Sequence, residues 1–99
     1  MEVIVTKDSQ QTTASLVGSL DTLAAQQIAP QMNELKDFEG TLVLDCEKLS
    51  YISSSGLRLF LMLRKAAAER GGKIIVRNIS NEIRSVFMMT GFLNLFDIQ

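Results

Sequence analysis

The sequence predicts a single α/β domain, residues 1–99, in which helices pack on a mixed sheet of about five strands. Two apolar runs, residues 41–46 and 73–77, have the length and composition of strands buried in a parallel sheet. A helical pattern lies between them, and a strand–helix–strand unit of this length implies a right-handed parallel crossover. Two segments near the N-terminus, the first of them rich in β-branched residues, add an antiparallel hairpin.

The predicted hairpin begins the chain. Residues 2–6 (EVIVT) alternate in polarity, as expected of a first strand, and residues 12–17 (TTASLV) form the second. The polar residues 7–11 between them form the turn, and we expect Gly18 to end the second strand.

A helix is predicted after the hairpin, with Asp21 or Thr22 as its N-cap and Gly40 as the end of the helical region. We expect Pro30 to kink or break this helix because proline lacks a backbone donor. Asp21 is also a candidate functional acid, although capping is the simpler interpretation. The apolar residues with helical spacing are Leu23, Ile28, Met32 and Leu35.

A longer helix is predicted after the serines, ending at Gly71 and Gly72, and a shorter one begins after Ser80 and ends at Gly91. A last short strand is expected over residues 94–98. The residues between Cys46 and the serines read as a polar connector. The apolar stripes are Leu59, Phe60, Leu63 and Ala67 on the longer helix, and Ile83, Val86 and Phe87 on the shorter one.

The composition excludes several classes of protein. Ten basic and 11 acidic residues give a net charge of −1, without the basic excess of nucleic-acid-binding proteins. No apolar run approaches the roughly 20 residues that span a bilayer, and no signal peptide is evident. The single cysteine, Cys46, cannot form an internal disulfide and is expected to be a buried apolar residue. We therefore expect a cytoplasmic protein.

Catalytic and metal-binding chemistry is also not expected. The chain has no histidine, so it has no Ser-His-Asp triad and no histidine-based metal site, and it has no nucleotide-binding glycine motif. We therefore expect no cofactor, no metal and no enzymatic activity.

Three consecutive serines, Ser53, Ser54 and Ser55, run into Gly56 at the start of the long helix. The hydroxyls have three possible roles: capping the helix, accepting a regulatory phosphate, or acting as a nucleophile, and the missing histidine argues against the last. Gly56 suggests that another backbone, such as a kinase loop, approaches the helix start closely.

At these positions the chain resembles the STAS domain, the fold of bacterial anti-sigma factor antagonists and of the cytosolic tails of sulfate transporters. The resemblance rests on several features in order. These are Gly18-Ser19-Leu20-Asp21, the strand that ends in Asp45, the serine-glycine turn, Gly71-Gly72, and Thr90-Gly91-Phe92. It implies an STAS-like α/β sandwich.

In the antagonists, a serine in the motif D-S-[ST]-G-L is phosphorylated by a partner that is both an anti-sigma factor and a serine kinase. Phosphorylation abolishes binding to that partner, and a serine phosphatase resets the switch. The resemblance implies that Ser54 is the phosphorylated position, with Ser53 and Ser55 as alternatives, because Ser53 stands where the motif has aspartate. The implied partner surface comprises Asp21, Ser53, Ser54, Ser55, Gly56 and Leu57.

The resemblance therefore implies an anti-sigma factor antagonist that controls sigma-factor-directed transcription by partner switching. The alternative is a constitutive STAS interaction subunit of a transport or signalling complex. Leu57 and Leu61 are neighbours on the helix, and they either form an apolar contact patch for the partner or are covered by the next helix.

Overall fold

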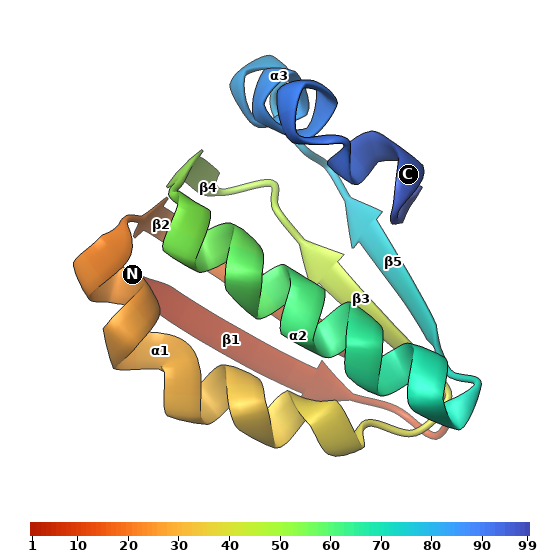
Figure 1. Ribbon diagram of the computed structural model, residues 1–99. Helices are drawn as coiled ribbons and strands as arrows, with labels where there is room; N and C mark the ends of the chain where they lie inside the picture. Colours follow the sequence, from red (N-terminus) through yellow and green to blue (C-terminus); the bar gives the residue numbers. More distant parts are fainter.

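The computed structural model describes all 99 residues as an α/β sandwich built on a six-stranded sheet (Figure 1). The strands are β1 (Glu2–Lys7), β2 (Gln11–Leu20), β3 (Thr41–Asp45), β4 (Leu49–Ile52), β5 (Lys73–Arg77) and β6 (Asp97–Ile98). The helices are α1 (Thr22–Glu34), α2 (Ser54–Arg70) and α3 (Asn81–Thr90), with short 3-10 turns at Leu35–Asp37 and Phe92–Asn94. The predicted fold class is confirmed.

The sheet has the strand order β1-β2-β3-β5-β6, and β4 pairs with β2 off this path. The predicted hairpin is present, because β1 and β2 pair antiparallel. The other pairings are parallel, and α2 lies between β3 and β5 in the chain, as the crossover requires. Helices α1 and α2 lie side by side over one face of the sheet (Figure 1).

The far end of β2 differs from the prediction. Gly18 does not end the strand, which continues to Leu20. The expected polar connector contains β4, which pairs with the last residues of β2 across a register shift between Gly18 and Ser19. Gly18 has a φ of +112°, a backbone conformation that glycine adopts without steric cost. The extended β2 leads into α1, and its pairing with β4 ties its last residues to the strand that leads into α2.

Helix α1 begins at the predicted N-cap, Asp21, whose carboxylate accepts a hydrogen bond of 2.8 Å from the N–H of Ala24. A break at Pro30 was a wrong prediction, because α1 continues through Pro30 to Glu34 before it tightens into the 3-10 turn. The proline is exposed, so it lies on the solvent side of the helix and not in the core.

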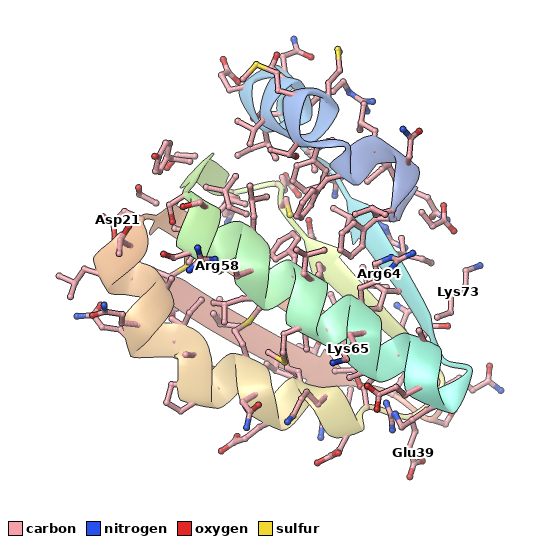
Figure 2. All side chains as sticks on the ribbon, viewed as in Figure 1. Asp21, Glu39, Arg58, Arg64, Lys65 and Lys73 are labelled. Carbon is pink, nitrogen blue, oxygen red and sulfur yellow. The ribbon has the colours of Figure 1, made fainter.

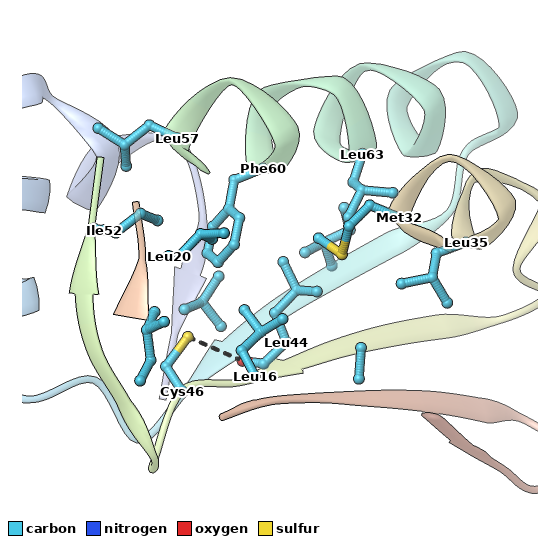
Figure 3. Close-up of a cluster of buried hydrophobic side chains, with 14 of the residues drawn as sticks. Leu16, Leu20, Met32, Leu35, Leu44, Cys46, Ile52, Leu57, Phe60 and Leu63 are labelled. Carbon is cyan, nitrogen blue, oxygen red and sulfur yellow. Dashed lines mark hydrogen bonds between the residues drawn. The ribbon is translucent and has the colours of Figure 1, made fainter. Parts of the chain in front are cut away.

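A core of 25 buried residues fills the space between the sheet and the helices. Leu42 and Leu44 of β3 are fully buried against it, as are Phe60 and Leu63 of α2. Figure 3 shows the part of this core under the first turns of α2, where Leu20 and Ile52 lie close to Phe60. The predicted stripe of α2 is therefore confirmed, except that Leu59 is only partly buried.

The C-terminal segment packs around four phenylalanines: Phe60, Phe87, Phe92 and Phe96. Ser80 caps α3 as predicted, accepting a hydrogen bond of 3.1 Å from the N–H of Ile83. The last strand is shorter than the predicted range, residues 94–98. Only Asp97–Ile98 pairs with β5, since the preceding residues form a 3-10 turn that directs Phe92 and Phe96 into the core.

Candidate functional site: the serine turn at the start of α2

The serine turn lies where β4 ends and α2 begins, at the end of the molecule where α1 also starts. Figure 2 shows Asp21 at the start of α1 and Arg58 on the first turns of α2 at this end. The N–H of Ser53 donates a hydrogen bond of 2.8 Å to the carbonyl of Leu20, so the turn is tied to the last residue of β2. The extension of β2 beyond Gly18 therefore positions the serines.

Ser53 is the N-cap of α2. Its hydroxyl oxygen accepts a hydrogen bond of 3.2 Å from the N–H of Gly56, and the residue is only 8% exposed. Serine and aspartate are about equally good N-caps, so a serine at the position where the STAS motif has aspartate keeps the capping bond. What changes at this position is the charge, because the serine is neutral.

Ser54 is the first residue of α2, and it is exposed. Its hydroxyl makes no hydrogen bond within the protein, whereas that of Ser53 is used for capping. Ser55 is partly buried. Of the three serines, Ser54 therefore presents the most accessible hydroxyl.

Gly56 faces inward. A Cβ on this residue would lie 2.7 Å from Cγ of Leu20 and 2.9 Å from Cγ1 of Ile52, closer than real Cβ contacts allow. The interpretation that Gly56 admits a partner's backbone is therefore corrected. The close approach is made within the domain, to the side chains at the ends of β2 and β4.

The predicted partner residues divide into two groups. Asp21 and Ser54 are exposed and Ser55 is partly exposed, whereas Ser53, Gly56 and Leu57 are buried beneath them. The second group supports the surface from within. Of the two leucines considered as an apolar patch, Leu57 is covered and Leu61 is 39% exposed.

Three exposed side chains near this end were absent from the predicted surface. They are Leu23 on the first turn of α1, Tyr51 on β4 and Arg58 on α2. Leu23 is 62% exposed and Tyr51 is 52% exposed. Because β4 was not predicted, Tyr51 was assigned to a connector. In a connector the sequence does not indicate whether a tyrosine side chain is buried or exposed.

The serine turn lies outside the hollows of the molecule. No hollow of the molecule is lined by Ser53, Ser54 or Ser55. No group of three histidine, cysteine, aspartate or glutamate side chains gathers closely enough to hold a metal ion. A surface without a hollow suits contact with another protein better than binding of a small molecule.

Two other expectations concern regions outside the turn. Cys46 is fully buried, and burial raises the pKa of its thiol to about 12, with a smaller contribution from the charge of Asp45. The thiol is therefore protonated and unreactive at neutral pH, as expected of a buried apolar residue. None of the helices combines the length and the apolar character needed to cross a bilayer.

The comparisons with known proteins agree with this fold. A protein of Bordetella bronchiseptica, BtrV, described as a candidate anti-sigma factor antagonist, is 33% identical over 86% of this chain and 74% of its own length. The structure of an STAS domain protein from Planctomyces limnophilus superposes with a TM-score of 0.89, at 19% identity, over 98% of this chain and 87% of the other.

A third similar structure is that of the Bacillus cell fate determinant SpoIIAA in its phosphorylated form. Its TM-score is 0.75 at 24% identity, and the match covers 99% of this chain and 91% of the other. The sequence pattern of STAS domains matches residues 3–99, which is almost the whole chain. The chain therefore belongs to the STAS domain family.

Proposed function

We propose that this protein is an anti-sigma factor antagonist that binds an anti-sigma factor with serine kinase activity and is released when Ser54 is phosphorylated. The observation that carries the proposal is the different placement of the three hydroxyls. Ser53 is buried and capping, Ser55 is partly buried, and Ser54 is exposed with a hydroxyl that makes no bond within the protein. The relationship to BtrV, which is described as a candidate antagonist, supports the same function.

In the unphosphorylated state the partner contacts a surface centred on Ser54. Asp21 and Ser55 belong to this surface, and Leu23 and Tyr51 supply the exposed apolar area that protein interfaces bury. Tyrosine is enriched among the residues that dominate binding energy, so Tyr51 is the expected apolar anchor.

Phosphorylation of Ser54 adds a charge of about −1.5 to −2 at the centre of this surface. A bound partner would have to remove water from this charge, which opposes binding. The fold itself does not need to change, because the capping bond of α2 is made by Ser53 and not by Ser54. The switch therefore works through charge and bulk, and a serine phosphatase restores the binding state.

This function makes the protein a regulator of transcription that acts in the cytoplasm through protein partners. It contacts no nucleic acid itself, and it contributes no catalytic residue, since the phosphoryl transfer is carried out by the partner kinase. The released sigma factor is the functional output of the switch.

The test is phosphorylation of the purified protein by candidate anti-sigma kinases from the same genome with ATP, followed by mapping of the phosphate by mass spectrometry. We expect the phosphate on Ser54. Ser54→Asp should weaken binding to the partner in calorimetry, and Ser54→Ala should preserve it, with Ser85→Asp on the exposed face of α3 as a matched charge control. A phosphate on none of the three serines would contradict the proposal.

The alternative function, a constitutive subunit of a transport or signalling complex, is favoured by one feature. Ser53 stands where the switching motif carries an acid, so the motif is incomplete. This alternative predicts a stable complex whose affinity is indifferent to Ser54→Asp. The same calorimetric experiment therefore separates the two functions.

A further inference from the structure

We propose that a phosphate on Ser54 is bound within the same helix by the guanidinium of Arg58, so that phosphorylation removes an exposed cation from the partner surface. This inference rests on the proposed function for the occurrence of the modification. It adds a residue, Arg58, that takes part in the regulation of the site.

The spacing of the two residues brings them together. Ser54 is the first residue of α2 and Arg58 is four residues later, so their side chains project from the same face, with Cβ atoms roughly 5–6 Å apart. Both residues are exposed. A phosphate on the Ser54 hydroxyl therefore lies within reach of the long arginine side chain.

Arg58 has no partner in the unmodified protein. Its guanidinium makes no hydrogen bond, and the one ion pair of the molecule joins Lys73 and Asp97 instead. Two other arginines of the same helix are engaged: Arg64 donates to the carbonyl of Leu95, and Arg70 donates to the carbonyl of Phe38 and stacks over its ring. Arg58 is thus the arginine of α2 that is left available.

The charges at the start of α2 favour the binding of an anion. The first turn of α2 contains no acidic side chain, and its cap, Ser53, is neutral. A cation within the first turns of a helix is unfavourable, because the N-terminal end of the helix dipole is also positive. Helix α1, which packs against α2, contributes Asp21 at this end, and its carboxylate is engaged as the cap of α1 and is not paired with Arg58.

The chemistry of the modified serine fits an arginine. A kinase transfers the γ-phosphoryl group of a nucleoside triphosphate: a bond forms from phosphorus to Oγ of Ser54, the bond to the bridging oxygen of the leaving diphosphate breaks, and the hydroxyl proton passes to a base of the kinase. The phosphate presents three acceptor oxygens, and the planar guanidinium can donate two parallel hydrogen bonds to them.

The pairing gives phosphorylation two effects on the surface. The phosphate adds negative charge at Ser54, and Arg58 folds onto it and no longer offers its guanidinium to an acidic group of the partner. A partner that contacts Arg58 in the unmodified state therefore loses a favourable contact and gains an unfavourable one.

The test uses full-length protein in which phosphoserine is incorporated at position 54 during translation, so that no kinase is needed. The second pKa of the phosphate is measured by phosphorus NMR during a pH titration. An i,i+4 ion pair on an exposed helix lowers that pKa by about 0.3, which follows from about 0.3–0.5 kcal/mol for such a pair. We expect this lowering to disappear in Arg58→Gln and to persist in Lys65→Gln, the matched control on the same exposed face.

A phosphate pKa in Arg58→Gln equal to that of the unsubstituted protein would overturn the inference. Arg58 is exposed and unbonded, so the variant is expected to fold, and circular dichroism checks this. Failure of the proposed function would give a different result from failure of this inference. In that case phosphoserine at position 54 leaves partner binding unchanged, whatever its pKa.

Discussion

The side chain of Leu20 fills the space that a Cβ on Gly56 would need, with Cγ only 2.7 Å from the ideal Cβ position. Leu20 is the last residue of β2, and it is fully buried. Its carbonyl also accepts the hydrogen bond from Ser53. One residue of β2 therefore holds both the cap and the first turn of α2, which sets the position of Ser54.

Gly56→Ala tests this contact. Forcing a methyl group into a packed core costs about 1–3 kcal/mol, and the better helix propensity of alanine offsets less than about 1 kcal/mol of it. We expect the free energy of unfolding, measured in urea, to fall by about 1–2 kcal/mol. In a Leu20→Ala background the contacts with the Leu20 side chain are removed and only the contact with Ile52 remains, so the same substitution should cost less. Equal costs in the two backgrounds would contradict the packing explanation.

Ser53→Ala removes the cap of α2 and should lower the free energy of unfolding by about 1 kcal/mol. Ser53→Asp restores an acceptor at the cap position, so its stability in urea should stay close to that of the unsubstituted protein. Ser54→Ala is the matched control, and it should leave stability unchanged because its hydroxyl makes no hydrogen bond. A destabilisation by Ser54→Ala as large as that by Ser53→Ala would show that the capping role is misassigned.

Phe87→Ala should be the most damaging of these substitutions. Phe87 is fully buried and contacts three other rings, with its centroid 6.2 Å from that of Phe60 and 5.5 Å from that of Phe92. Its loss is expected to cost about 3–5 kcal/mol in thermal or urea unfolding. Met89→Ala on the same helix removes a side chain that is 83% exposed, and it should change stability by less than about 0.5 kcal/mol.

Cys46 predicts a pH dependence of stability. Burial raises the pKa of its thiol from 9.0 to about 12, so above pH 9 the unfolded chain loses a proton that the folded protein keeps. The contribution of this thiol is fully present below pH 9 and is lost as the pH rises towards 12. By about pH 10 the loss amounts to about 1.4 kcal/mol.

The measurement is urea unfolding at several pH values, with Cys46→Ala as the control variant that isolates the contribution of this thiol. The alkaline fall in stability should be shallower in the variant. The native thiol should also resist iodoacetamide until the protein unfolds. Rapid labelling of the folded protein would contradict the burial of Cys46.

The sequence by itself determined the elements whose signals are local. Alternating or continuous apolar runs predicted β1, β3 and β5, and hydroxyl or carboxyl caps predicted the starts of α1 and α3. These signals suffice because a cap bonds within three residues and an apolar period reflects which face of an element is buried. The fold class followed from their order along the chain.

Only the tertiary structure decided what happens at the serine turn. The strand β4 has the burial pattern buried, exposed, exposed, buried, which is not an alternation, and it exists because it pairs with residues of β2 some thirty positions earlier. That pairing brings Leu20 and Ile52 under Gly56, directs the Ser53 hydroxyl to the backbone and leaves the Ser54 hydroxyl exposed. Three identical side chains in a row cannot be distinguished by composition, because their roles depend on contacts with residues far away in the sequence.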